Sequence, residues 1–264
     1  MIISFHYHAH WQAASPATRH AVAFRCIPLV TPDTALRSLS VRFDPSVTLT
    51  WGTDAFGNAV LSGYIPWPHD SYDLYSAGTV DYREASVAAS PCPYFYRCFT
   101  PLTAPGDSIR ALHASLPLAQ ASTAREKAVR IAKALGGILR YRPGQTTTAT
   151  TAEEALAKGG GVCQDYTHIF LSLCRLSGIP CRYMAGIFRD GGETHAWAQI
   201  HDGERWLTVD PTHGTWGQDS LLAFSCGRDF CDAAMERGVM TGGGIQTQSV
   251  SGTVNRMQVN SLQV

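Results

Sequence analysis

Residues 160–170 read GGVCQDYTHIF, so Cys163 stands directly after a run of glycines and directly before an apolar stretch. The apolar residues that follow recur at the spacing of one helix face, which predicts a helix over residues 163–177. Gly178 and Pro180 lie where such a helix would end. A helix N-terminus has unpaired N–H groups and a partial positive charge, and both favour a thiolate. Cys163 is therefore a candidate nucleophile, although a free cysteine is more often a small buried core residue.

The glycines before the helix suggest an open approach to the sulfur. Gly159, Gly160 and Gly161 carry no side chain that could obstruct a substrate. The free N–H groups of the helix could also hold the oxyanion that forms when a thiolate attacks a carbonyl group. The Cys163 N–H is the expected first donor, and the sequence leaves the second donor open.

A histidine and an aspartate fall on two predicted strands that follow the helix. The strands are THAWAQIH (194–201) and RWLTVD (205–210), and the Asp202-Gly203 pair between them predicts a two-residue type I′ hairpin. That register puts His195 directly opposite Asp210, with Cβ atoms about 4.5–5.5 Å apart. A carboxylate beside an imidazole is the orienting half of a nucleophile–base–orienter triad. Either residue alone would be an ordinary sheet residue.

Three stretches of the chain resemble the bacterial transglutaminase-like superfamily. They are GVCQDYTHIFLSLCRLSGIPCRYMAG (161–186), ETHAWAQI (193–200) and GERWLTVDPTHG (203–214). The pattern has a Cys that opens a helix, a His in a Thr-His-Ala-Trp strand and an Asp in an Asp-Pro-Thr segment. Weaker likenesses at residues 54–58 and 141–146 extend the resemblance over nearly the whole chain.

The resemblance implies an α+β fold with a papain-like transglutaminase core, in which the helix bearing the cysteine packs on an antiparallel sheet. It implies Cys163 as nucleophile, His195 as general base and acid, and Asp210 as the residue that orients the imidazole. His213 departs from the pattern, because such proteins often carry Asn after Asp-Pro-Thr.

The implied activity is that of a transglutaminase-like cysteine peptidase or amidase. It would hydrolyse amide or peptide bonds of a peptide or protein through a thioester acyl-enzyme, with no cofactor and no metal. A triad does not choose between water and an amine, so transglutaminase-type acyl transfer is an alternative. A non-catalytic binding module with the same fold is a further alternative.

The chain divides by composition into a β-rich N-terminal domain (1–100) and a catalytic domain (101–264). Proline, glycine and serine are frequent over residues 89–108, which predicts a linker there. The N-terminal strand ISFHYHAHW (3–11) alternates apolar and His residues. Its three histidines could bind a metal, but a solvated strand face is the favoured interpretation. After the linker, residues 122–140 have the pattern of a helix.

The bulk composition excludes several classes of partner. Lys+Arg and Asp+Glu both number 21 among 264 residues, so there is no basic excess for nucleic acid. No apolar run is long enough to span a membrane, and the N-terminal residues lack the pattern of a secretion signal. Eight cysteines without a CxxC pair fit reduced thiols in the cytoplasm. The oligomeric state is left open.

Overall fold

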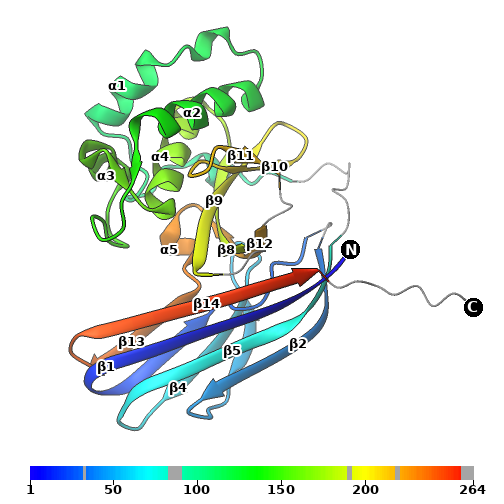
Figure 1. The fold of residues 1–264 in the computed structure, drawn as a ribbon, viewed down its shortest axis with the longest axis vertical. Coiled ribbons are helices and arrows are strands. Elements are labelled where there is room, and N and C mark those ends of the chain that lie inside the picture. The colour runs from blue at the N-terminus through cyan, green and yellow to red at the C-terminus, as the bar shows by residue number, and fades with distance from the viewer. Residues whose placement is uncertain (32–33, 83–90, 189–191, 218–220, 257–264) are drawn as a thin grey trace, which may run out of the picture.

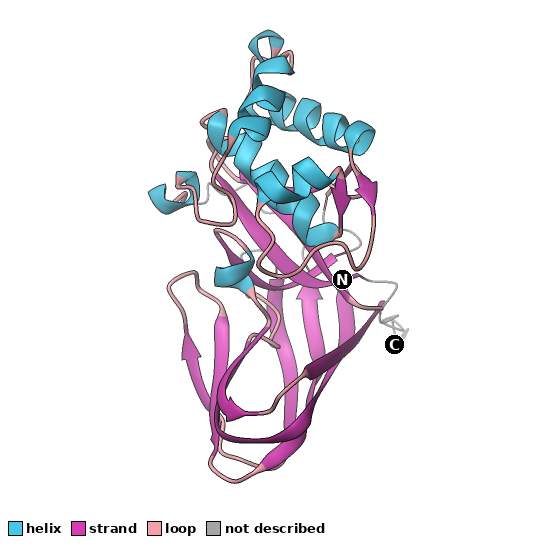
Figure 2. Ribbon diagram, turned by 90° about the vertical axis from the view of Figure 1, so that its left-hand side faces the viewer, coloured by secondary structure: helices cyan, strands magenta, loops and turns pink. Residues whose placement is uncertain are grey.

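The computed structural model describes residues 1–31, 34–82, 91–188, 192–217 and 221–256. It has two parts packed against each other, one a sheet of long strands and the other a smaller sheet with helices (Figure 1). The helices gather at one end of the molecule and the long strands at the other (Figure 2). The prediction of an α+β fold is confirmed. Within the described residues, no helix combines the length and apolar character needed to cross a membrane.

The larger sheet is built around one long strand, β1 (Ile2–Phe24). The first half of β1 pairs with β5 and β14, and the second half pairs with β4 and β13. The odd-numbered side chains from Ile3 to Trp11 are buried, as the alternating pattern predicts. The other strands of this sheet are β2 (Thr34–Asp44), β3 (Thr50–Thr53), β4 (Ala59–Ile65), β5 (His69–Tyr82), β13 (Glu236–Gly242) and β14 (Gln246–Arg256).

The last two strands return to the N-terminal sheet. Both β13 and β14 pair antiparallel with β1. The expected division into 1–100 and 101–264 therefore does not describe residues 236–256, which belong to the first sheet by hydrogen bonding. Residues 246–259, QTQSVSGTVNRMQV, are polar and β-like, which predicts a strand but does not identify its partner strand. The end of this predicted strand, residues 257–259, lies outside the described residues.

The smaller sheet has the antiparallel order β11-β10-β9-β8-β12 and carries the central helix α4 (Cys163–Leu176). Every residue of α4 from Asp165 to Arg175 is buried, because α1, α2 and α3 cover the sides that the sheet leaves open. The strands of this part are β8 (Cys181–Phe188), β9 (Thr194–His201), β10 (Trp206–Asp210), β11 (Thr215–Trp216) and β12 (Leu221–Gly227), with the pair β6 (Arg140–Tyr141) and β7 (Gly160–Gly161) beside α4. The remaining helices are η1 (Tyr94–Arg97), α1 (Asp107–Ser115), η2 (Leu118–Gln120), α2 (Ala124–Ile138), α3 (Ala152–Lys158) and α5 (Phe230–Ala233).

The predicted helices over 122–140 and 163–177 are confirmed as α2 and α4. Thr123 begins α2 as its N-cap, with its hydroxyl oxygen accepting from the Glu126 N–H. The predicted linker contains η1 and the start of α1, which the sequence pattern did not indicate. Residues 89–90 of that linker lie outside the described residues.

The register of the β9–β10 hairpin differs from the predicted one. His201 pairs with Trp206 and Gln199 with Thr208, so the loop has four residues where two were expected. The Asp202 carboxylate accepts from the N–H groups of Glu204 and Arg205, which stabilises the longer turn. The pairing is shifted by two residues, and a two-residue shift keeps every side chain on its predicted face.

A turn at residues 54–58 joins the two parts. The Asn58 side chain is fully buried and makes two hydrogen bonds of 2.8 Å with the backbone of Cys226 in β12, one to its carbonyl and one from its N–H. Asp54 supports the turn by accepting from the Asn58 side chain and from Arg25. The buried amide of Asn58 is thus one of the contacts that join the larger sheet to β12 of the smaller sheet, beside the packing of Phe5 on Phe224.

We expect Asn58→Ala to lower the free energy of unfolding by about 2–4 kcal/mol, because it leaves the N–H and C=O of Cys226 buried without partners. Urea unfolding followed by tryptophan fluorescence would measure this loss. Thr53→Ala, at an exposed position of the neighbouring strand, should change the stability by less than about 0.5 kcal/mol. Equal stability of the two variants would contradict this account of the junction.

Candidate active site

Cys163 is the first residue of α4, as predicted. The chain enters the helix through Val162 in an extended conformation, and the Asp165 carboxylate accepts a 2.7 Å hydrogen bond from the Val162 N–H. The Thr146 hydroxyl donates to the same carboxylate oxygen at 2.7 Å. Asp165 therefore fixes the position at which the helix begins, and with it the position of the sulfur.

The glycines before Cys163 have a different role from the one expected. Gly159 has a φ of 67° as the left-handed C-cap of α3, which favours glycine. Gly160 and Gly161 are buried, and a Cβ atom on them would lie 2.4 Å from the Arg140 carbonyl oxygen and 2.2 Å from the Asp165 carboxylate, respectively. The expectation of an open approach over Gly160 and Gly161 is wrong, because these residues are needed for close packing behind the helix.

His195 and Asp210 are brought together despite the shifted register. The distance between His195 Nε2 and Asp210 Oδ2 is 2.8 Å, and the two side chains are only 7% and 2% exposed. Because the register is shifted by two, the residues are diagonal neighbours on one face of the sheet, and the long side chains still reach each other. The ring of Phe188 stacks on His195 at a centroid distance of 4.2 Å and holds the imidazole plane.

Asp210 also holds a second imidazole. His213 Nδ1 lies 2.8 Å from the same Asp210 Oδ2, and Asp210 Oδ1 accepts from the N–H groups of Thr212 and His213. His213 is half exposed, whereas Asp210 is buried. The departure from the family pattern at residue 213 therefore adds a partner to the carboxylate and leaves its bond to His195 in place.

The pKa values follow from this pairing. Burial alone lowers the pKa of His195, but hydrogen bonds with Asp210 and Cys163, and their charges, outweigh it and raise the pKa from 6.5 to about 9. Burial raises the pKa of Asp210, but the bonds and charges of His195 and His213 outweigh it and lower that pKa. A buried carboxylate thus stabilises an imidazolium whose next partner is the Cys163 thiol.

The three side chains His195, Asp210 and His213 also form a group whose ligand atoms lie within 4.8 Å of one another. It is the one such group of metal-ligand type among the described residues, and its members are already joined by hydrogen bonds. Of the N-terminal histidines, His8 and His10 contact the Asp73 carboxylate of the neighbouring strand at 2.7 and 3.1 Å.

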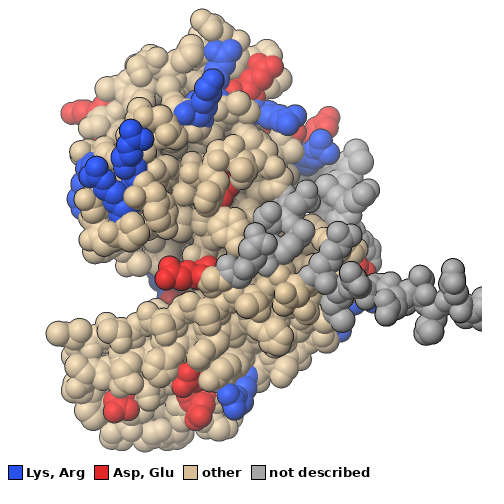
Figure 3. Space-filling model, viewed as in Figure 1, with Lys and Arg blue, Asp and Glu red and all other residues tan. Residues whose placement is uncertain are grey.

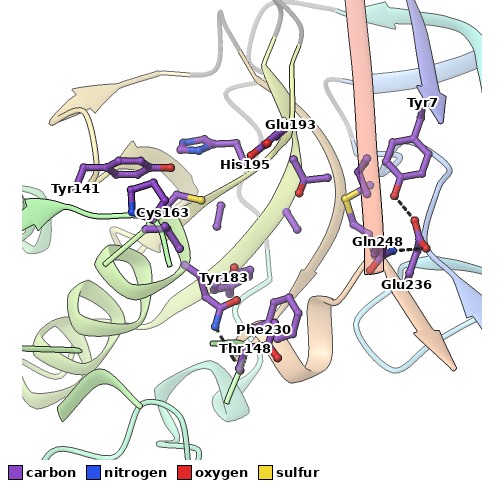
Figure 4. Close-up of a pocket in the computed structure, with 18 residues that line it drawn as sticks. Tyr7, Tyr141, Thr148, Cys163, Tyr183, Glu193, His195, Phe230, Glu236 and Gln248 are labelled. Carbon is purple, nitrogen blue, oxygen red and sulfur yellow. Dashed lines mark hydrogen bonds between the residues drawn. The ribbon is translucent and has the colours of Figure 1, made fainter. Parts of the chain in front are cut away.

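A cavity of about 370 Å³ opens beside the triad (Figure 4). Cys163, His195 and Tyr141 lie on one side of it, and residues of the N-terminal sheet lie on the other (Figure 4). Tyr141 was not predicted as a site residue. The parallel pairing of β6 with β7 brings it next to the start of α4. In the sequence, only the family likeness at residues 141–146 indicated that Tyr141 could lie near the site.

The chain is similar to several curated proteins of mycobacteria. It is 33% identical over 129 residues to an uncharacterised protein of Mycobacterium leprae, which covers 45% of this chain and 46% of that protein. It is 28% identical over 116 residues to an uncharacterised protein of Mycobacterium tuberculosis, which covers 38% of this chain and 37% of that protein. The matches therefore span less than half the length of these relatives.

Among solved structures, the chain is similar to a candidate cysteine protease from Cytophaga hutchinsonii. The TM-score is 0.81 at 19% sequence identity, and the alignment covers 98% of this chain and 92% of that chain. At this level of identity the similarity establishes the fold.

Two family models match the chain, one in each part. The model of the transglutaminase-like superfamily matches residues 113–211, which include Cys163, His195 and Asp210. The model of the bacterial transglutaminase-like N-terminal region matches residues 3–81, which form most of the larger sheet. The chain therefore belongs to the transglutaminase-like superfamily and carries the N-terminal region of its bacterial members.

Proposed function

We propose that this protein is a cysteine-dependent hydrolase of amide or peptide bonds, acting in the reducing cytoplasm. The observation that carries the proposal is the bond of 2.8 Å between His195 and the buried Asp210, with Cys163 lining the same cavity as His195. A nucleophile, a base and an orienter in one site fit acyl transfer through a covalent intermediate.

In the proposed first step the Cys163 sulfur attacks the amide carbonyl carbon and forms a thioester. Asp210 engages Nε2 of His195, so Nδ1 is the ring nitrogen left to exchange a proton with the sulfur. The imidazolium then protonates the nitrogen of the leaving amine as the C–N bond breaks. In the second step His195 takes a proton from water, the hydroxide adds to the thioester, and the thiolate leaves with release of the acid.

The oxyanion would be held by two donors. The first is the backbone N–H of Cys163, which belongs to the first turn of α4 and has no intrahelical partner. For the second we propose the Tyr141 hydroxyl, since Tyr141 lines two cavities that are also lined by Cys163 and His195. Gln164 also lines the cavity, but its amide nitrogen donates to the Thr148 carbonyl oxygen at 3.3 Å.

We expect iodoacetamide to label Cys163 before the other seven cysteines of the native protein. Four of those, Cys26, Cys174, Cys181 and Cys226, are buried, whereas Cys163 is partly exposed beside His195. His195→Ala should slow the labelling, because the imidazolium that stabilises the thiolate is lost. Mass spectrometry of the peptides after timed alkylation would measure the rate at each cysteine.

Cys163→Ala is the matched control for this experiment. It should remove the rapidly formed label, keep the thermal unfolding transition and abolish hydrolysis of any amide substrate. Cys231, which is exposed and outside the site, gives the reference rate of an ordinary thiol. If Cys163 labelled no faster than Cys231 in the wild-type protein, the hydrolase proposal would fail and the binding-module alternative would take its place.

The His195 ring should titrate with a midpoint near 9 in the folded protein. Because the pKa is raised above its ordinary value, this group stabilises the fold fully below about pH 6.5 and progressively less as the pH rises through 9. Asp210→Asn keeps the shape of the side chain but removes its charge, so the midpoint should fall. NMR titration of the ring would measure both midpoints without a substrate.

His213→Asn tests whether the second imidazole matters to this midpoint. Its ring is half exposed and solvent screens its charge, so the variant should move the His195 midpoint less than Asp210→Asn does. An equal shift in the two variants would make His213 an integral member of the site, contrary to this expectation.

A further inference from the structure

The cavity that contains Cys163 continues to a carboxylate on the opposite wall. Glu236 is the first residue of β13, and it lines the cavity together with Tyr7 of β1 and Gln248 of β14 (Figure 4). All three belong to the N-terminal sheet, and the triad belongs to the catalytic sheet. A molecule that reaches Cys163 through this cavity therefore passes a wall that the triad does not supply.

Glu236 is held by neutral donors. The Tyr7 hydroxyl donates to one carboxylate oxygen at 2.7 Å, and the Tyr72 hydroxyl donates to the other at 3.2 Å. The side-chain amide of Gln248 donates to the second oxygen as well. No lysine or arginine forms an ion pair with Glu236 in the described part of the chain. The carboxylate is positioned, but its charge has no cationic partner.

Burial makes this charge unfavourable. Desolvation raises the pKa of Glu236, and the bonds from Tyr7, Tyr72 and Gln248 offset only part of that effect. A cation placed against the carboxylate would compensate the charge directly. His8 is the titratable group whose charge acts favourably on Glu236 from the same sheet.

A second carboxylate lines the cavity on the side of His195. Glu193, just before the catalytic strand β9, lines the same cavity, and no lysine or arginine is among its lining residues. The neighbouring Arg237 points to the other face of β13 and lines a separate cavity. In the space-filling view, acidic atoms lie at the edge of the hollow between the two parts (Figure 3).

Aromatic rings complete the wall between the two carboxylates. Tyr141, Tyr183 and Phe230 line the cavity on the catalytic side, and Tyr7 lines it on the other (Figure 4). Carboxylates combined with aromatic faces are the groups that bind alkylammonium and guanidinium cations in proteins. An anionic ligand would be repelled by the two carboxylates, and a neutral ligand would gain only from contact with the rings.

We propose that Glu236 and its donors form a recognition subsite for a cationic group, alkylammonium or guanidinium, on the molecule that carries the scissile amide. The substrate class is then a peptide or protein with a basic side chain near the bond that is broken. This inference rests on the proposed function, because it assigns the cation to the same molecule that acylates Cys163. Glu236 is a binding residue and takes no part in the chemistry.

The test compares two alkylating probes of equal length, N-(4-aminobutyl)iodoacetamide and N-pentyliodoacetamide. Both transfer their carbon to the Cys163 sulfur with loss of iodide, and only the first carries a cation. In the wild-type protein we expect the cationic probe to label Cys163 about tenfold faster, which corresponds to one moderate charge interaction. The ratio of the two rates should fall to about one in Glu236→Gln and remain unchanged in Glu204→Gln, an exposed acid on the β9–β10 loop.

A second variant covers the case in which Glu236→Gln fails to fold. Gln248 is exposed on β14, so Gln248→Lys should be tolerated. The ammonium group of the new lysine would form an ion pair with the Glu236 carboxylate and exclude the cation of the probe. The preference for the cationic probe should then disappear although Glu236 is still present. A ratio near one in the wild-type protein, or a ratio lost in Glu193→Gln but kept in Glu236→Gln, would overturn the assignment.

Two outcomes separate this inference from the proposed function. If Cys163 reacts rapidly with both probes at equal rates, the hydrolase proposal stands and the cationic subsite fails. If Cys163 reacts with neither probe, the hydrolase proposal fails, and the subsite proposal fails as well because it depends on that function.

The cation could also belong to an amine acceptor, and the reaction product distinguishes the two sources. A lysine-containing peptide amide should be cleaved faster than its norleucine counterpart and give the free acid when butylamine is present. Formation of the butylamide in place of the acid would assign the subsite to the acceptor and overturn the inference as stated.

Discussion

The charge of Asp210 is the constraint on which the rest of the site depends. A carboxylate that is 2% exposed is stable only if its oxygens are fully bonded, and Asp210 accepts from His195, His213 and two backbone N–H groups. The same charge keeps the His195 imidazole in its protonated form, with a pKa of about 9. The geometry that satisfies a buried carboxylate is thus also the geometry that places an imidazolium in the cavity of Cys163.

The site could be predicted from the sequence because its three members depend on local rules. The position of Cys163 follows from the pattern that marks the start of a helix, and strand alternation puts His195 and Asp210 on one face of a hairpin. The predicted register was wrong by two residues, since the Asp202 side chain closes a longer turn than an Asp-Gly pair alone suggests. His195 and Asp210 still lie on one face because the shift is an even number of residues. A shift of one residue would have turned Asp210 to the opposite face.

The wall opposite the triad could not be predicted in this way. It requires β13 and β14 to return across the whole length of the chain and pair with β1, and pairing between such distant strands has no local sequence signal. In the sequence, Gln248 belongs to a polar, β-like stretch and Glu236 to the loop-rich segment before it, yet both line the cavity of Cys163. Tyr141 was not predicted as a site residue, because it too reaches the site through strand pairing that has no local sequence signal. The parallel pairing of the short strands β6 and β7 brings it to the start of α4.

The two parts of the molecule contribute different kinds of residue to one cavity. The smaller sheet and α4 supply Cys163, His195 and Asp210, and their positions are tied to helix and strand geometry that leaves little room for variation. The N-terminal sheet supplies Tyr7, Glu236 and Gln248, which touch the cavity but not the triad. Residues on that wall can change without disturbing the bond between His195 and Asp210. A fold arranged in this way can keep one set of side chains around Cys163 while the charge and shape of the opposite wall change, provided that the contacts between the two sheets, the buried amide of Asn58 among them, are kept.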